Sequence, residues 1–159
     1  MTHPLLSALL VVLVVLLLSA GIEDVRTREI ANWKNAAIAL LAPLWWVATG
    51  VSLWPGVPIQ LAVAVLVFGL FVGAFWMGQM GGGDVKLIGA LALWLPPFPL
   101  LWMLVAMSLL GGVLTLLMLG DKLLRKKKEL PEIPYGVAIV MAALLAIREP
   151  ILNQFALTA

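Results

Sequence analysis

Residues 4–22 read PLLSALLVVLVVLLLSAGI, an almost unbroken run of Leu and Val with no charged side chain. A helix needs about 20 apolar residues to cross a hydrocarbon core of roughly 30 Å. The run has nearly that length, so it predicts a transmembrane helix. In a bilayer the backbone N–H and C=O groups must be bonded within the protein, and a helix achieves this within a single segment.

The composition of the whole chain agrees with this interpretation. Of 159 residues, 64% are hydrophobic and 11% are charged, whereas a soluble domain has about 45–50% apolar and 25% charged residues. These values exclude a water-soluble domain, a disordered chain and a nucleic-acid-binding protein of the usual basic kind. The chain has no Cys and a single His, His3, which nearly excludes a zinc enzyme or a Cys–His nucleophile. We expect no metal and no cofactor.

Further apolar segments continue the pattern along the chain. Four approach the length of a span: residues 35–54, with a kink expected at Pro43, residues 58–77, residues 100–119, and residues 135–147, which could extend past Pro150 through residues 151–157. A shorter stretch, residues 85–95, is closed by three prolines. We therefore predict an all-α fold: one integral membrane domain, residues 1–159, forming a polytopic bundle of six transmembrane helices.

The basic residues support six spans. With six, nine of the ten Lys and Arg fall in the first, third and fifth connections: Arg26, Arg28, Lys34, Lys86, Lys122, Arg125, Lys126, Lys127 and Lys128. The positive-inside rule places those connections in the cytoplasm and both termini outside. Without the short fourth span, the connection with five charges would be external. We expect the run Lys126–Lys128 to act in topology and to contact anionic lipid.

Aromatic and small residues add packing expectations. Five tryptophans fall near predicted membrane boundaries, at the outer side Trp54, Trp94 and Trp102 and at the inner side Trp33 and Trp76. Trp45 and Trp46 lie mid-span and have no role there beyond packing. Gly69 and Gly73 form a small-xxx-small pair, which predicts a closely packed neighbouring helix.

The first span has a competing interpretation. Residues 5–18 followed by Ser19, Ala20 and Gly21 also resemble the core and cleavage point of a signal peptide. No basic residue precedes the apolar run, however, and removing this helix would upset the charge pattern. We therefore favour a retained first helix.

The aspartates are the candidates for chemistry. There are three, Asp24, Asp84 and Asp121, and Asp121 stands beside a basic run. The predicted topology puts Asp24, at the end of the first helix, and Asp84, at the start of the short one, on the same side of the membrane. Gly81, Gly82 and Gly83 precede Asp84, permit unusual backbone angles and leave no side chain to obstruct a peptide. Asp84 could also simply be the N-cap of its helix.

The length of the short segment favours a functional role for Asp84. Residues 85–99 make about 22 Å of helix, which is shorter than the hydrocarbon core of roughly 30 Å. Asp84 would therefore lie below the membrane surface, where a carboxylate is a candidate for a functional site. Asp24 alone could be an ordinary polar loop residue. At the same depth, the two acids could share one proton and activate a water molecule for attack on a peptide carbonyl.

Three segments carry a family resemblance. Residues 81–84, GGGD, fit the GxGD signature of membrane aspartyl proteases, and residues 80–95, MGGGDVKLIGALALWL, resemble its type IV prepilin peptidase version. Residues 22–33, IEDVRTREIANW, are similar to that family's first aspartate segment, with Ala31 where the family usually has Pro. Residues 133–136, IPYG, resemble a third family segment.

The resemblance implies a leader peptidase of the bacterial inner membrane. It implies that Asp24 and Asp84 are catalytic, that the three glycines present Asp84, and that short basic leaders of prepilins or pseudopilins are cleaved after a glycine on the cytoplasmic side. Glu23 and Glu29 could contact such a leader. Longer members carry a cysteine-bearing zinc segment and also N-methylate their product. This chain resembles the short Flp/Tad-pilus form, so we expect peptidase without methyltransferase activity.

Two alternatives stay open at this point. A small transporter or secretion-system subunit could use the same acids for proton relay or helix pairing. Another GxGD protease could cut archaeal preflagellins or other transmembrane segments. The sequence predicts neither an oligomeric state nor roles for Lys86 and Asp121.

Overall fold

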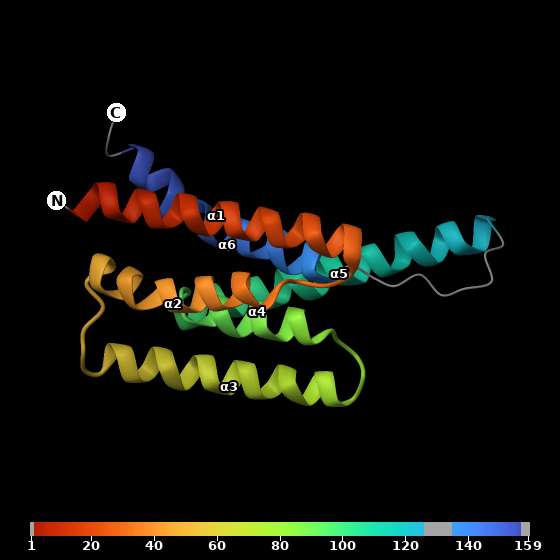
Figure 1. The fold of residues 1–159 in the computed structure, drawn as a ribbon, viewed down its shortest axis with the longest axis horizontal. Helices are drawn as coiled ribbons and strands as arrows, with labels where there is room; N and C mark the ends of the chain where they lie inside the picture. Colours follow the sequence, from red (N-terminus) through yellow and green to blue (C-terminus); the bar gives the residue numbers. More distant parts are fainter. Residues whose placement is uncertain (1, 126–134, 157–159) are drawn as a thin grey trace.

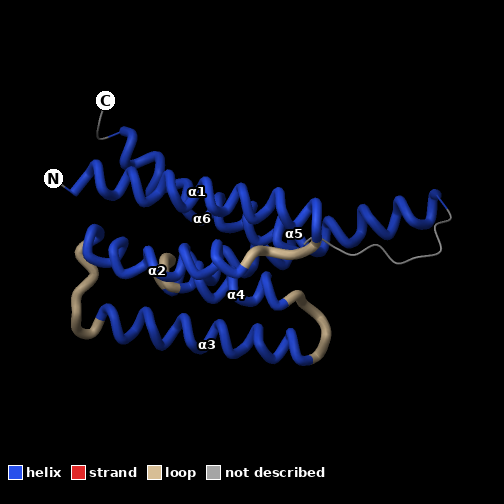
Figure 2. The backbone as a smooth tube through the Cα atoms, in the orientation of Figure 1, coloured by secondary structure: helices blue, strands red, loops and turns tan. Residues whose placement is uncertain are grey.

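The computed structural model describes the backbone of residues 2–125 and 135–156 and the side chains of residues 4–121 and 135–148. Within these ranges the chain forms six helices and no strand (Figure 2). The helices are α1 (Thr2–Thr27), α2 (Asn32–Thr49), α3 (Gly56–Trp76), α4 (Gly82–Ala92), α5 (Pro97–Arg125) and α6 (Tyr135–Ala156). The all-α expectation and the order of the six helices are confirmed.

Several helix ends differ from those expected. The first helix continues through Asp24 to Thr27, because residues 23–27 keep the helical hydrogen bonding that hydropathy alone does not detect. The second ends at Thr49, five residues earlier than expected, where Gly50 takes a left-handed conformation with φ of +71°. Pro43 lies inside this helix, and the last helix continues through Pro150.

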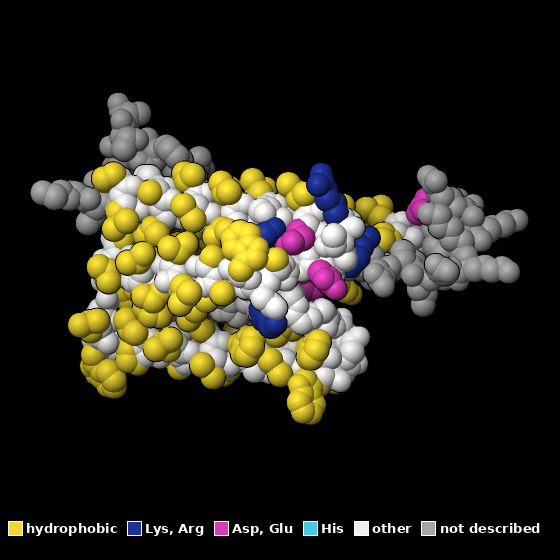
Figure 3. Space-filling view, in the orientation of Figure 1, with side chains coloured by type: hydrophobic (Ala, Val, Ile, Leu, Met, Phe, Trp, Pro, Cys, Tyr) yellow, Lys and Arg dark blue, Asp and Glu magenta, His cyan; other side chains and the backbone are white. Residues whose placement is uncertain are grey.

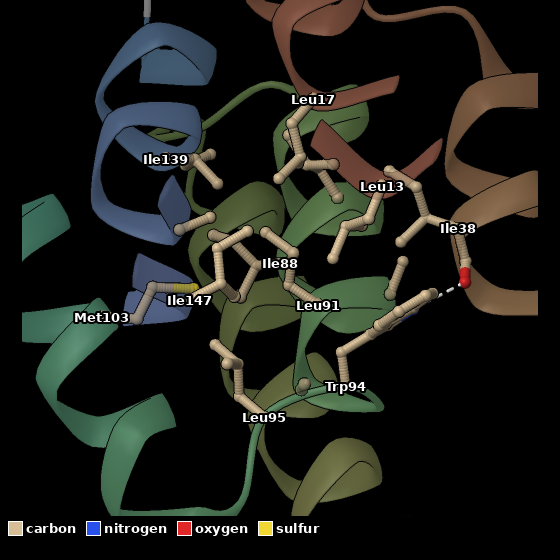
Figure 4. Close-up of a cluster of buried hydrophobic side chains, with 14 of the residues drawn as sticks. Leu13, Leu17, Ile38, Ile88, Leu91, Trp94, Leu95, Met103, Ile139 and Ile147 are labelled. Carbon is tan, nitrogen blue, oxygen red and sulfur yellow. Dashed lines mark hydrogen bonds between the residues drawn. The ribbon is translucent and has the colours of Figure 1, made fainter. Parts of the chain in front are cut away.

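Helix α4 lies at the centre of the bundle. Both α2 and α3 pack against it, while α1 packs along α2 and α6, and α6 also contacts α4 and α5 (Figure 1). Seven of its eleven residues are buried. Figure 4 shows Ile88 and Leu91 of α4 among Leu13 and Leu17 of α1 and Ile139 of α6.

Side chains of α2 and α3 donate hydrogen bonds to the free backbone carbonyls at the C-terminal end of α4. The amide of Gln60 donates to the carbonyl oxygens of Ala92 and Leu95 at 2.7 and 2.6 Å. The indole N–H of Trp46 donates to the Leu93 carbonyl at 2.7 Å. A short helix can therefore end inside an apolar bundle, because its free carbonyls find donors there. These bonds also give Trp46 a role.

Three of the helices are long and apolar enough to cross a membrane, with spans Pro4–Thr27, Gly56–Trp76 and Pro97–Asp121, and residues Tyr135–Arg148 form a shorter apolar helix. Helix α4 has eleven residues, or about 16 Å, which is shorter than the sequence suggested. The first turn of α2 carries Asn32, Lys34 and Asn35. Six helices are observed, while six membrane crossings stay a prediction.

The two ends of the bundle differ in polarity. The α1–α2 and α3–α4 connections lie at one end, and the start of α1 and the α2–α3 connection lie at the other (Figure 1). The α4–α5 connection stops short of that second end. On the face shown in Figure 3, charged side chains gather at the first end and hydrophobic side chains cover most of the rest. Lys126, Lys127 and Lys128, and residues 133–134 of the IPYG segment, lie outside the described residues.

Trp94 is not an interfacial anchor, and that expectation is wrong. Its side chain is only 3% exposed, its indole N–H donates to the Ile38 carbonyl at 2.8 Å, and its ring stacks on Trp45 at 5.4 Å. The reason is that α4 ends inside the bundle, so a tryptophan just after it is buried. The other four predicted anchors are exposed: Trp33, Trp54, Trp76 and Trp102.

Gly69 and Gly73 do not mark a close helix contact within the described residues. A Cβ atom added to either would meet nothing within 4 Å, so the expectation from the small-xxx-small pair is wrong for this fold. The close contact between α3 and α4 involves Gly89 instead, where a Cβ would lie 2.6 Å from the Phe68 ring.

Candidate active site

Asp24 lies in the last turn of α1 and is 4% exposed. Arg28 follows the helix with a left-handed φ of +59°, a conformation that ends helices and that is costly for a residue other than glycine. The helix thus stops within one turn of Asp24. The Asp24 carboxylate points toward the beginning of α6.

The first turn of α6 binds the Asp24 carboxylate. The backbone N–H of Val137 donates to Asp24 Oδ2 at 3.2 Å, and the backbone N–H of Gly136 also donates to this carboxylate. These groups belong to the helix N-terminus, where N–H groups lack partners in the helix and favour an anion. A Cβ on Gly136 would lie 2.7 Å from Asp24 Cγ, so glycine is needed for this approach.

Asp84 lies in the first turn of α4 and is 8% exposed. The N-cap of the helix is Gly81, whose backbone is extended, so the interpretation of Asp84 as N-cap is wrong. The carboxylate instead reaches back to accept a hydrogen bond from the Gly81 N–H, as an acidic residue at the third helical position does in a capping box.

The three glycines serve close packing rather than unusual backbone angles. The glycines with positive φ in the described residues are Gly50 and Gly78, and Gly82 and Gly83 are helical, so the unusual backbone angles that these glycines permit are not used here. A Cβ on Gly83 would lie 3.2 Å from the backbone nitrogen of Ile30. The absence of a side chain therefore lets the α1–α2 connection lie directly on the start of α4.

The structure brings Asp24 and Asp84 together at the charged end of the bundle. Burial and the negative charge of Asp24 raise the pKa of Asp84 to about 7, and the hydrogen bond from Gly81 acts in the opposite direction. Asp84 lies outside the three long apolar spans. Two buried carboxyl groups that sense each other cannot both ionise easily, so the pair favours a state with one proton.

Polar residues at the start of α2 hold this arrangement, and the sequence interpretation missed them. The amide of Asn35 donates to the Gly83 carbonyl at 3.1 Å. Lys34 is buried and donates to the Ser19 carbonyl at 3.1 Å. Their position at the beginning of an apolar segment was the available signal, because buried polar side chains need partners.

The two glutamates proposed as leader contacts differ in their surroundings. The Glu23 carboxylate forms an ion pair with Lys34 at 2.9 Å and accepts a hydrogen bond from the Ala31 N–H at 3.0 Å. Glu29 is exposed. Glu23 therefore closes the α1–α2 connection, and Glu29 is the freer of the two for contact with another molecule.

Two other charged residues lie near the pair. The Arg28 side chain senses the charge of Asp24, and its Nη1 is buried without a hydrogen-bond partner among the described residues. Lys86, two residues after Asp84, donates to Asn32 Oδ1 at 2.7 Å. No group of three or more His, Cys, Asp or Glu side chains that could hold a metal occurs in the described part of the chain.

In a comparison with sequence models of protein families, residues 11–116 match the type IV leader peptidase family. The matched range contains both Asp24 and Asp84 and ends before α6. Neither the curated proteins nor the solved structures gave a match to this chain.

Proposed function

Because the chain belongs to the type IV leader peptidase family, we propose that it is a membrane-embedded aspartyl endopeptidase. Its substrates would be type IV prepilins or pseudopilins, from which it removes the short basic leader at the cytoplasmic face of the bacterial inner membrane. The observation that carries the proposal is the pair of buried carboxyl groups, Asp24 and Asp84, at one end of the bundle. Family membership favours a peptidase over a transporter or secretion-system subunit.

The surroundings of the two acids suggest different roles. Asp24 accepts hydrogen bonds from two backbone N–H groups at a helix N-terminus; these donors oppose the cost of burying its charge, and we assign it the role of the base. Asp84 has a pKa of about 7 and is the acid. In the first step, Asp24 takes a proton from water as the water oxygen bonds to the carbonyl carbon. Asp84 gives its proton to the carbonyl oxygen, which forms a neutral tetrahedral intermediate.

The second step returns both acids to their starting states. The carbon–nitrogen bond breaks while Asp24 gives its proton to the departing nitrogen. A hydroxyl of the intermediate returns its proton to Asp84 as the new carboxyl group forms. The balance is one peptide bond and one water converted to an acid and an amine. Two aspartates supply both proton transfers.

The proposed location suits the substrate. A prepilin has its leader in the cytoplasm and its apolar helix in the bilayer, so the scissile bond lies near the inner interface. The α1–α2 connection lies at the charged end of the bundle (Figure 1) and carries exposed Glu29, which would attract a basic leader. Large exposed apolar side chains on the helices, such as Val15, Leu66 and Leu116, suit lipid contact.

Cleavage of a prepilin tests the proposal. The protein in liposomes is incubated with a prepilin, and the products are weighed by mass spectrometry. We expect loss of a leader-sized fragment with the wild type and with Asp121→Asn, a matched aspartate outside the pair, and no loss with Asp84→Asn. An intact prepilin in every sample would overturn the proposal.

We further propose that the product is not methylated. The chain has no Cys, and four residues, 28–31, connect α1 to α2, so the cysteine-bearing segment of the longer relatives has no counterpart there. Transfer of a methyl group from S-adenosylmethionine to the new N-terminus by the purified protein would contradict this.

A further inference from the structure

The groove between α2 and α3 has α4 as its floor and a volume of about 470 Å³. Its walls include Ala36 and Ala39 of α2 and Leu61 and Val65 of α3. We infer that this groove binds the apolar helix of the substrate, the segment that follows the scissile bond. The inference rests on the proposed function and adds to it the surface by which the substrate is held.

The shape of the groove suits a helix. Lys86, Gly89, Ala90 and Leu93 line the floor, a distance of about two helical turns, or 10 Å. The α2 wall presents the small side chains of Ala36 and Ala39. Small residues let a second helix approach closely in a bilayer, where packing rather than hydrophobicity drives association.

The polarity of the groove fixes which way the occupant runs. Its polar lining residues are Asn32, Asn35 and Lys86, all close to Asp84 in sequence or through hydrogen bonds. The remainder of the lining is apolar. An occupant must therefore be polar at the active-site end and apolar beyond it. The proposed substrate has this pattern, with the scissile peptide first and the apolar helix after it.

The side-chain oxygen of Asn35 is a hydrogen-bond acceptor without a donor among the described residues. The residue is 4% exposed. Its amide nitrogen is bonded to Gly83, but its Oδ1 is buried and has no hydrogen-bond partner among the described residues. An unpaired buried acceptor is destabilising, because it has lost its hydrogen bonds to water. A substrate helix that begins at the scissile bond has free backbone N–H groups in its first turn, and one of these can pair with Asn35 Oδ1.

Cross-linking tests the position of the substrate helix. Because the chain lacks Cys, Val65→Cys in the groove and Leu66→Cys outside it give two sites without background; both native side chains are 70% exposed. Each is combined with Asp84→Asn to prevent cleavage. The probe is a synthetic peptide in liposomes with a basic leader, a glycine, an apolar helix and one cysteine, moved through fourteen positions.

We expect cross-links to form mainly at the cysteine inside the groove and on one face of the peptide helix. Val65→Cys should cross-link to peptide positions three or four residues apart, as one helix face requires, at least about fivefold more than Leu66→Cys does. Equal cross-linking at both sites, or no periodicity, would overturn the inference and leave lipid acyl chains as the occupant of the groove.

Kinetics separate this inference from the proposed function. Ala36→Trp fills the groove and Ala62→Trp makes the same change at an exposed position of α3 outside it. We expect Ala36→Trp to raise KM about tenfold for the helix-bearing peptide, with kcat unchanged, and Ala62→Trp to have no effect. If the wild type cleaves and Ala36→Trp matches it, the groove assignment is wrong and the peptidase stands. If the wild type cleaves nothing, the peptidase itself is wrong.

Discussion

The backbone N–H of Val137, in the first turn of α6, donates a 3.2 Å hydrogen bond to Oδ2 of Asp24 in the last turn of α1, across 113 residues of sequence. The end of one helix thus faces the beginning of another, and the N–H groups of the second hold the acid of the first. Asn35 helps to position the other acid, because its amide donates to the carbonyl of Gly83, the residue before Asp84. Each aspartate is therefore positioned by a helix that is remote in sequence but packs against its own helix.

Gly136→Ala should disable the pair without unfolding the protein. The added Cβ would lie 2.7 Å from Asp24 Cγ, so either the carboxylate or the start of α6 must move. A misplacement of about 1 Å can cost roughly 100-fold in rate, so we expect kcat to fall by about that factor. The matched control is Gly69→Ala, where a Cβ meets nothing within 4 Å. Equal cleavage rates for the two variants would show that the close approach of Gly136 to Asp24 does not affect catalysis.

The cleavage rate should depend on pH through Asp84. Its pKa is raised to about 7, so the carboxyl group holds the proton it must donate below that pH and loses it above. Above pH 7 the rate should fall about tenfold for each pH unit. Initial rates measured in liposomes between pH 6 and pH 9 test this, and a rate that stays level to pH 9 would contradict the assignment of Asp84 as the acid.

Asp84→Asn should stabilise the protein at alkaline pH. Because the folded state holds the Asp84 proton more tightly than the unfolded state, where the pKa is near 3.8, wild-type stability falls between about pH 4 and pH 7 and stays reduced above that. The neutral amide avoids this cost. We expect the variant to melt about 5 °C higher at pH 8.5, with the difference vanishing near pH 4. Tryptophan fluorescence in detergent measures it, and a pH-independent difference would refute the linkage.

Glu23, in the last turns of α1, and Glu29, just after that helix, should respond differently to substitution by Gln. Glu29→Gln should raise KM for a peptide with a basic leader about threefold, and added salt should remove the effect, because Glu29 is exposed. Glu23→Gln should lower the melting temperature, since it weakens the bonds to Lys34 and Ala31. A salt-sensitive KM effect for Glu23→Gln alone would reverse these assignments.

Hydropathy and charge in the sequence predict much of this fold. Six helices occur in the expected order, and Asp24 and Asp84 meet at the end that carries the first and third connections. These features follow from local patterns: apolar runs mark helices, and the number of helices between two residues decides whether they share an end.

Features that depend on packing between helices were not predictable in the same way. Trp94 follows an apolar run as an anchor would, and only the burial of α4 puts it in the core. The glycines before Asp84 signal freedom of the backbone, whereas in the structure Gly83 admits Ile30 and Gly82 lies against the Phe75 ring. No local pattern encodes the bond from the Val137 N–H to Asp24 or the bond from Asn35 to the Gly83 carbonyl beside Asp84.

The central claim is that Asp24 and Asp84 act as one unit on one water molecule, and single and double substitutions test it most directly. We predict that Asp24→Asn and Asp84→Asn each lower kcat/KM roughly 10³-fold, and that the double variant is no slower than either single one, because groups that act together are not additive. Losses that multiply in the double variant, or full cleavage by either single variant, would contradict the account.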